Sequence, residues 1–233
     1  VVDDKNRINI CGVYSGTTDF DPSASQNLVS SSLTNHEAFV QTLDDQGFTT
    51  LLYTPSGPGA DYIQEIEVDN HGDIYFAGSF SDSINMAAGS KLYSNGANDL
   101  FLGKVSGTGN YLWSYSIGGS SESLASIKID MLGNLYAVGN FKDSLRLRSS
   151  SDTTVFPSIG SRDIFAIGLA GNGSFLWLDR IGSGAHEDCF GFDIDASGNF
   201  YLSGNLGPTA FDFDPSSNVY NIPSTRRGGV FLA

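Results

Sequence analysis

The sequence predicts an all-β protein built from repeated units of four short antiparallel strands. Its composition is the first reason: 28 of the 233 residues are glycine, 16 are phenylalanine and 10 are tyrosine, whereas charged residues make up 16%. Tight turns and aromatic strands have this composition, and long solvent-facing helices do not. The second reason is self-similarity, because the pattern Gly-(Asp/Asn)-x-Tyr-x-x-Gly occurs at Gly72–Gly78, Gly133–Gly139 and Gly198–Gly204.

The second glycine of this segment marks the period of the repeat. It recurs at 78, 139 and 204, and a degraded copy, Arg7–Tyr14, supplies a fourth at 12, so the intervals are 61 to 66 residues. Intervals of this regularity indicate one structural unit that is repeated about four times.

Each unit contains four predicted strands in a fixed order. The strands are short, rich in aromatic or β-branched residues, and bounded by Gly, Asn, Asp or Ser. The innermost strand ends at an aspartate, and a turn with Gly-Asn, whose residues tolerate positive φ, leads into the second strand. The third strand opens with an acidic residue, and a Gly-rich turn precedes the outermost strand, which carries Leu-Trp in two units.

The pattern assigns strands to all four units. In the second unit they are Tyr62–Asp69, Asp73–Phe80, Asp99–Val105 and Tyr111–Ile117. The third unit runs from Leu124 to Ile181. In the first they are Val1–Asp3, Asn6–Tyr14, Ala38–Leu43 and Phe48–Tyr53, and in the fourth Asp188–Asp195, Asn199–Leu206 and Val230–Ala233.

Four antiparallel strands per unit, with no unit able to bury both of its faces alone, predict the blades of a β-propeller. We assign the blades to residues 1–57, 58–119, 120–184 and 185–233, the last incomplete. Because the pattern begins and ends inside a repeat, we expect a fragment of a larger propeller. Flanking repeats or partner strands would then pair with both ends, since unpaired edges promote aggregation.

The charge balance excludes some partners. The formal net charge is −14, whereas nucleic acids and anionic membrane surfaces require basic patches. No apolar run is long enough to insert into a membrane. Cys11 and Cys189 lack the spacing of a zinc or thioredoxin-like motif, which favours two small buried thiols on strands and leaves one disulfide as the alternative.

Two loops with the sequence Asp-Phe-Asp-Pro are candidate metal sites. Their carboxylates stand two residues apart, and oxygen-rich loops of this kind can hold calcium. The candidate calcium ligands are Asp19, Asp21, Asp212 and Asp214. The alternative is an Asx-turn, in which the aspartate caps the backbone and proline stiffens the exit.

Acidic residues also recur in phase with the repeat. One set ends the innermost strands and another precedes them: Asp3, Asp69, Asp130 and Asp195, and Asp61, Glu122 and Glu187. Repetition in every unit favours a structural capping role. The competing hypothesis is that both sets, with Glu65, Glu67 and Asp193, form one acidic rim that attracts cations or basic partners.

The remaining residues offer no catalytic constellation, so the sequence predicts a protein that is not an enzyme. His36, His71 and His186 are expected in surface loops, because adjacent strand residues point to opposite faces and do not converge on one ion. Trp113 and Trp177 occupy the same position in consecutive units. They are expected to be buried anchors between blades, with sugar stacking as the alternative.

The repeat resembles a known family. The pattern Ile-x-x-Asp, turn, Gly-Asn-x-Tyr-x-x-Gly-x-Phe, followed by Asp-x-Phe-x-x-Lys at Asp99–Lys104 and Leu-Trp at 112–113, resembles the bacterial β-propeller repeats labelled SBBP. The Asp-Phe-Asp-Pro loops are similar to those of large surface and secreted proteins of Bacteroidetes, many of which leave by the type IX secretion route. The resemblance implies an exported protein at the cell surface or outside the cell, with a periplasmic or outer-membrane location as the alternative.

The functional expectation is a binding or display scaffold that acts in protein–protein interaction or adhesion. Short loops between strands would present a protein or glycan partner with a polar face on a stiff stack of blades. The alternatives are a carbohydrate-binding, lectin-like propeller and a scaffold subunit or cargo of an envelope secretion or assembly complex.

Overall fold

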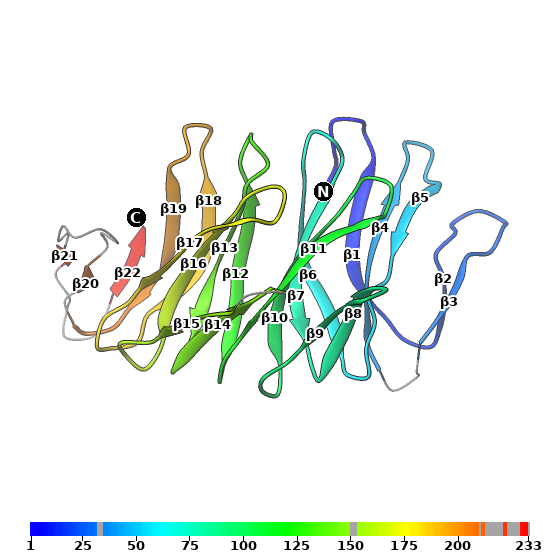
Figure 1. The fold of residues 1–233 in the computed structure, drawn as a ribbon. Helices are drawn as coiled ribbons and strands as arrows, with labels where there is room; N and C mark the ends of the chain where they lie inside the picture. Colours follow the sequence, from blue (N-terminus) through cyan, green and yellow to red (C-terminus); the bar gives the residue numbers. More distant parts are fainter. Residues whose placement is uncertain (32–34, 150–152, 210, 213–220, 223–228, 233) are drawn as a thin grey trace. The chain divides into compact units, whose positions relative to one another are not determined.

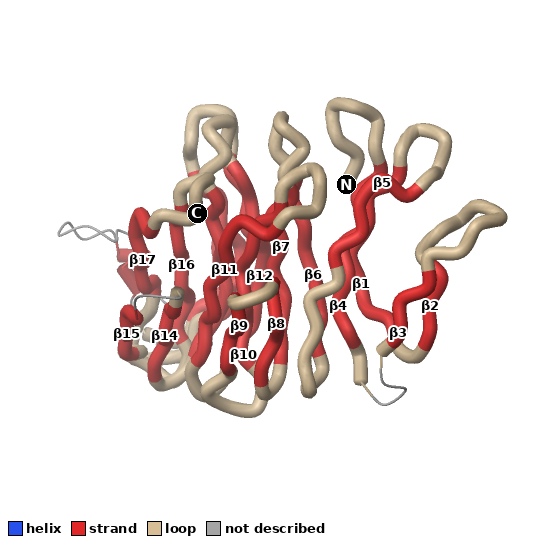
Figure 2. Tube along the Cα trace, turned by 45° about the vertical axis from the view of Figure 1, so that its right-hand side comes forward, coloured by secondary structure: helices blue, strands red, loops and turns tan. Residues whose placement is uncertain are grey.

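The computed structural model describes residues 1–31, 35–149, 153–209, 211–212, 221–222 and 229–232. Within these residues every regular element is a β-strand, and the strand ladders are antiparallel (Figure 2). The predicted all-β class is therefore confirmed, whereas the assembly of its sheets into a propeller stays a prediction. The chain divides into two compact parts, which are larger than the four predicted repeats. They are called unit 1 (Val1–Ser116) and unit 2 (Ile117–Ala233).

Unit 1 contains two sheets, each with an added hairpin (Figure 1). The first sheet has the order β1 (Ile8–Tyr14), β4 (Glu37–Leu43) and β5 (Thr49–Tyr53). The second sheet has the order β6 (Asp61–Val68), β7 (Ile74–Phe80), β10 (Asp99–Val105) and β11 (Tyr111–Gly118). The boundary between the two units falls within β11. The hairpins are β2 (Thr17–Asp19) with β3 (Leu28–Ser30), and β8 (Ser83–Ala87) with β9 (Ser90–Tyr93).

Unit 2 repeats this organisation. Its first sheet has the order β12 (Glu122–Ile129), β13 (Leu135–Phe141), β16 (Asp163–Leu169) and β17 (Phe175–Ile181). Its second has the order β18 (Asp188–Ile194), β19 (Phe200–Leu206) and β22 (Gly229–Leu232). The hairpins are β14 (Ser144–Arg148) with β15 (Thr153–Pro157), and β20 (Phe211–Asp212) with β21 (Asn221–Ile222).

The hairpin between the second and third strands of each repeat was not predicted. Asp82 and Asp143 begin two of these hairpins with φ of 59° and 60°. Their carbonyl groups accept hydrogen bonds of 2.8 Å from the N–H groups of Ser94 and Ser158, which close the hairpins. Aspartate tolerates this left-handed conformation better than most residues. The Asp-Ser pair at each position was therefore the available sequence signal.

The predicted innermost strand of the first repeat is also wrong in extent. The segment Val1–Asp3 is not a strand and forms a single β-bridge, which pairs Val2 with Ile8. The carboxylate of Asp3 instead binds the N–H groups of Lys5 and Arg7 and so closes a turn.

The glycine that marks the repeat stands where the backbones approach most closely. A Cβ on Gly78 would lie 1.8 Å from the carbonyl oxygen of Tyr62, and one on Gly204 would lie 1.9 Å from that of Asp188. The register shifts immediately beyond these positions, between Ile63 and Glu65 in the first case. Because a β-bulge brings the bent innermost strand against its neighbour, only glycine fits there.

Apolar side chains between the sheets form the core of each unit. In unit 1, Phe76, Phe80 and Phe101 are fully buried, and in unit 2 Phe141 and Phe165 are. Full burial of a phenylalanine contributes ~1.5–3 kcal/mol to stability.

Candidate functional site

The predicted calcium loop at Asp19 and Asp21 folds as a turn held by its own carboxylates. Asp19 Oδ1 accepts hydrogen bonds from the N–H groups of Asp21 (3.0 Å) and Asn27 (2.9 Å), and Asp21 Oδ1 accepts one from Ser23 (2.8 Å). Hydrogen bonds from the hydroxyl and N–H groups of Ser23 lower the pKa of Asp21. These bonds are those of Asx-turns.

In the second predicted loop, Asp212 lies in β20 and Asp214 lies outside the described residues. Within the described part of the chain, no group of three or more Asp, Glu, His and Cys side chains is placed to hold a metal ion. Calcium binding at these loops stays a prediction.

The aspartate at the end of the innermost strand caps the turn that follows it. Asp130 Oδ1 accepts hydrogen bonds from the N–H groups of Leu132 (2.9 Å) and Asn134 (2.8 Å), and its Oδ2 accepts one from the Tyr136 hydroxyl (3.0 Å). Partial burial opposes ionisation, but these bonds outweigh it and lower the pKa of Asp130. The same backbone bonds recur at Asp3, Asp69 and Asp195. The repeated aspartates therefore have the capping role that their repetition predicted.

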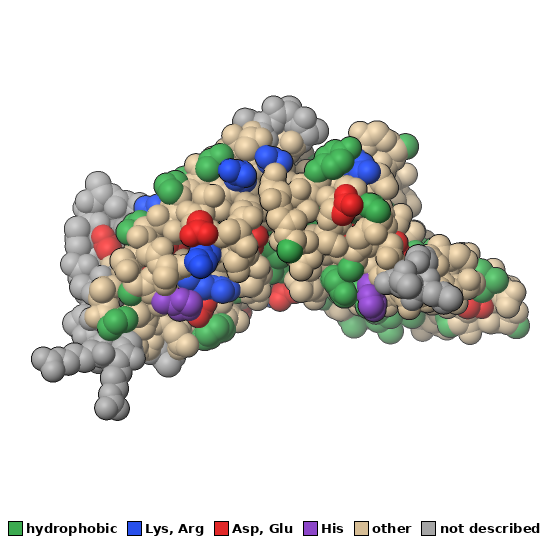
Figure 3. Space-filling view, turned by 90° about the horizontal axis from the view of Figure 1, so that it is seen from below, with side chains coloured by type: hydrophobic (Ala, Val, Ile, Leu, Met, Phe, Trp, Pro, Cys, Tyr) green, Lys and Arg blue, Asp and Glu red, His purple; other side chains and the backbone are tan. Residues whose placement is uncertain are grey.

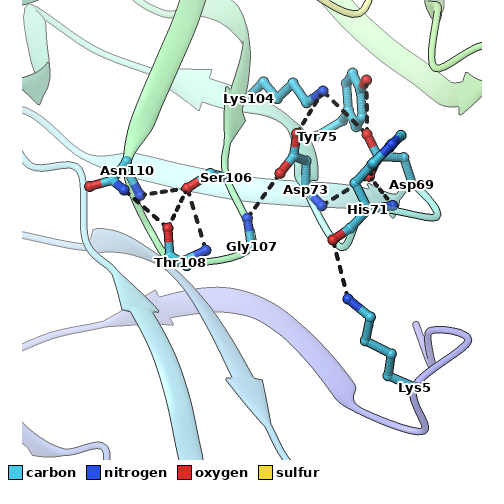
Figure 4. Close-up of polar contacts among 10 residues, drawn as sticks. All are labelled: Lys5, Asp69, His71, Asp73, Tyr75, Lys104, Ser106, Gly107, Thr108 and Asn110. Carbon is cyan, nitrogen blue, oxygen red and sulfur yellow. Dashed lines mark hydrogen bonds and ion pairs between the residues drawn. The ribbon is translucent and has the colours of Figure 1, made fainter.

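One of these turns also holds an ammonium group (Figure 4). Lys104 Nζ lies 3.2 Å from Asp69 Oδ2 and 3.1 Å from Asp73 Oδ2, and 4.4 Å from the centre of the Tyr75 ring. The lysine and Asp69 side chains are each 7% exposed. Burial opposes the charge of Lys104, but its bonds to Tyr75, Asp73 and Asp69 outweigh that effect and raise its pKa. Asp73 also accepts a hydrogen bond from the N–H of Gly107 (3.0 Å). These contacts tie three strands of one sheet together.

The competing hypothesis of a single acidic rim is wrong. Asp61 begins β6, whereas Asp69 follows its end. A strand of 8 residues separates the two by roughly 25 Å at ~3.3 Å per residue. Asp61 and Glu187 are moreover fully buried. The two recurring sets of acids therefore lie at opposite ends of the strands.

Basic, acidic and histidine side chains lie beside one another on the face shown in Figure 3. In unit 2, Asp188 pairs with Arg162 Nε at 2.9 Å and with His186 Nε2 at 2.9 Å. His186 and Asp188 are two residues apart, so their side chains lie on the same side of the chain. The expectation for the histidines considered only adjacent residues, which point to opposite faces, and therefore missed this pair. His71 is a surface residue with 80% of its side chain exposed, as predicted, and the ring of His36 stacks on Tyr62.

Unit 1 contains a buried pair of carboxyl groups, Glu37 and Asp61. Their side chains hydrogen-bond to each other, and the other described donors do not reach Asp61. Glu37 also accepts a bond from the N–H of Gly57 (3.2 Å). Burial and the Glu37 carboxyl raise the pKa of Asp61 to about 8. In unit 2, Glu187 stands at the position of Asp61 and accepts two hydrogen bonds from Ser183, at 2.9 and 2.6 Å.

Unit 2 contains a cavity of about 250 Å³ between its two sheets. Alternation along β17 points Trp177, Asp179 and Ile181 to the same side, toward residues of β18 and β19. The lining is aromatic and aliphatic apart from one carboxylate: Tyr136, Val138, Ala166, Trp177, Asp179, Ile181, Phe192, Phe200 and Leu202. A concave, mostly apolar site with one carboxylate is a typical ligand-binding arrangement.

The equivalent space in unit 1 is filled. Tyr53 and Asp179 occupy the same position in their repeats. Each opposes the fourth residue of the neighbouring third strand, which is Val40 for Tyr53 and Ala166 for Asp179. The Tyr53 ring packs against Phe76, and its hydroxyl donates a hydrogen bond to the carbonyl oxygen of Met86 (2.7 Å). In unit 2, Asp179 and Leu202 stand where unit 1 has these two aromatic rings. Two smaller side chains in place of two rings account for the cavity.

Apolar side chains are also exposed at one end of this unit 2 sheet. Met131 and Leu132 are 83% and 85% exposed, and Phe175 and Leu176 are each 45% exposed. Strand register places them at one end, because Leu169 opposes Leu135 on one side and Phe175 on the other. The matching turn of the second repeat carries Asn70 and His71 instead. Several exposed apolar residues together indicate an interaction surface.

The predicted burial is right for Trp113, which is 9% exposed, whereas its role as an anchor between blades stays a prediction. The predicted burial is wrong for Trp177, which is only partly buried and lines the cavity. The sequence signal for the cavity was that Asp179 stands where the first repeat has Tyr53. Composition does not show this difference, because it becomes visible only when the repeats are aligned residue by residue. Both cysteines are free thiols on strands; Cys189 is buried and Cys11 half-buried.

Neither a protein-family model nor a curated protein sequence matches this chain. Among the described residues there is no helix with the length and hydropathy that crossing a membrane requires.

Proposed function

We propose that this chain is a non-enzymatic segment of a β-propeller that binds a partner through unit 2. Repeated antiparallel sheets with the same bulge and the same capped turn supply a stiff scaffold. The observation that carries the proposal is the open cavity, at a position where unit 1 has close-packed side chains. A repeat that only needed stability would fill this space, because interiors are packed to high density.

The lining of the cavity supports binding rather than catalysis. Hydrolytic and acid–base mechanisms combine an acid, a base or a nucleophile within hydrogen-bond reach of one substrate atom. The cavity presents one carboxylate, Asp179, among apolar side chains.

The proposal extends to family and location. We assign the chain to the SBBP-type repeats on the shared Gly-Asn-x-Tyr-x-x-Gly pattern, and place it outside the cytoplasm, at the bacterial cell surface. Protease treatment of intact cells, followed by detection with an antibody to this segment, tests the location. Loss of the signal is expected, and protection until the cells are lysed would contradict it.

A peptide-display library selected on the purified protein tests the binding function. Asp179→Tyr introduces the residue that unit 1 has at this position and should close the cavity without loss of stability. We expect the selected peptides to bind the parent and Tyr93→Ser, which alters an exposed aromatic of unit 1, and to bind Asp179→Tyr at least tenfold more weakly. Equal binding to all three proteins would refute the proposal.

The same protein on a glycan array tests the lectin-like alternative, which the exposed edge of Trp177 favours. If a glycan binds the parent protein and Asp179→Tyr abolishes that binding, the ligand of the cavity is a sugar rather than a protein. Co-purification of a membrane protein with the tagged chain would instead indicate a scaffold subunit of an envelope complex.

A further inference from the structure

The rings that line the unit 2 cavity form one continuous aromatic wall. The centres of Tyr136 and Trp177 are 5.9 Å apart, those of Tyr136 and Phe200 are 4.9 Å apart, and those of Trp177 and Phe200 are 5.9 Å apart. Aromatic faces carry partial negative charge, so such a wall attracts cations that lose part of their hydration.

The single carboxylate of the cavity also favours a cation. Asp179 stands two residues after Trp177 on β17, is partly buried, and forms no ion pair with a cation among the described residues. An unpaired carboxylate beside apolar side chains favours a positively charged ligand. The net charge of −14 adds a weaker, long-range attraction of the same sign.

The second repeat shows how this chain holds a cation beside the tyrosine ring that corresponds to Tyr136 of the third repeat. Tyr75 corresponds to Tyr136, and the ring of Tyr75 carries the ammonium group of Lys104 at 4.4 Å. In unit 2 the position of Lys104 is taken by Gly168, where a Cβ would lie 2.6 Å from Trp177 Nε1. The tyrosine ring is therefore kept, but the ring of Trp177 stacks on it where the second repeat has the lysine, so a cation in this cavity would lie against Trp177.

The size and polarity of the cavity narrow the ligand further. Clefts for drug-sized ligands measure roughly 300–1,000 Å³, so about 250 Å³ fits one long side chain rather than an oligosaccharide. A sugar also needs several polar partners for its hydroxyl groups, and this lining offers few. A lysine combines an apolar stem with a charged end and so matches both features.

We propose that the unit 2 cavity binds a lysine side chain of a partner protein, with the stem against Val138, Ala166 and Leu202 and the ammonium group between Asp179 and the ring of Trp177. This inference rests on the proposed binding function and adds the chemical class of the ligand.

Two peptides test the assignment: acetyl-Gly-Gly-Lys-Gly-Gly-amide, and the same peptide with norleucine, which keeps the stem and lacks the ammonium group. Binding is measured from Trp177 fluorescence in the Trp113→Phe protein, which has no other tryptophan, and from NMR shifts. We expect the lysine peptide to bind about tenfold or more tightly than the norleucine peptide, since one charge-assisted contact accounts for a factor of this size.

Asp179→Asn should weaken binding of the lysine peptide about tenfold and leave the norleucine peptide unaffected. Asp193→Asn is the matched control, because it removes the same charge from an exposed position of β18 outside the cavity, and it should leave both peptides unaffected.

Equal affinity for the two peptides, equal effects of the two asparagine variants, or no binding of either peptide would overturn the lysine assignment. Tighter binding of choline than of the lysine peptide would also overturn it, in favour of a small ammonium ligand. If the assignment fails while library-selected peptides still require an open cavity, the proposed binding function stands and only the ligand class is wrong.

Discussion

Replacing Asp61 by asparagine should stabilise unit 1 at neutral pH. In the folded chain the pKa of Asp61 is about 8, against an ordinary value of 3.8. Folding at pH 7 therefore requires this carboxyl to take up a proton that it lacks when unfolded. About three pH units separate 3.8 from pH 7, and each unit costs ~1.4 kcal/mol. The uptake thus lowers stability at pH 7 by up to about 4 kcal/mol, a cost that the neutral asparagine avoids.

The sign of this effect fixes its pH dependence. Because the folded pKa of Asp61 is the higher one, its contribution to stability is fully present below pH 3.8 and is lost as pH rises toward about 8. The stability difference between Asp61→Asn and the parent should therefore be small at pH 4, grow steadily to pH 7, and level off above pH 8.

Urea unfolding followed by Trp113 fluorescence in the Trp177→Phe protein measures this difference in unit 1. The matched control is Glu187→Gln in unit 2, followed by Trp177 in the Trp113→Phe protein. Glu187 accepts two hydrogen bonds from Ser183, so the amide should destabilise by about 1–3 kcal/mol. A pH-independent difference for Asp61→Asn, or a loss of stability at pH 7, would refute the inference that this carboxyl is held protonated.

Three other outcomes are expected. Lys104→Met should lower the free energy of unfolding in urea by about 3–5 kcal/mol, because two carboxylates lose their buried counter-charge. Adding Asp73→Asn should restore part of this stability, and no restoration would contradict the charge explanation. Asp130→Ala should cost about 1–3 kcal/mol at pH 7. Because the pKa of Asp130 is lowered in the folded state, the cost should shrink as pH falls below 3.8, and a pH-independent cost would argue against it. If the Asp-Phe-Asp-Pro loops hold structural calcium, as predicted, a chelator should lower Tm, and an unchanged Tm would contradict that prediction.

Local sequence chemistry was sufficient to predict most strands and turns. The innermost, second, third and outermost strands of the second repeat lie within a residue or two of the predicted ranges. The capping role of Asp130 could also be predicted, because its carboxylate binds groups no more than six residues away. Such contacts depend on neighbours in the chain, which a repeated pattern displays directly.

Contacts between distant residues could not be predicted in this way. The pairing of Glu37 with Asp61 and the cavity beside Asp179 depend on which side chains meet between sheets and how well they fill the space. Tyr53 and Asp179 occupy the same position in two copies of one pattern, yet one completes a core and the other borders a cavity. The sequence alone determined the repeat, the all-β class and the capped turns, because these follow from local backbone preferences. Only the tertiary structure decided where the repeats differ in packing, because packing density and burial are properties of side chains brought together by folding.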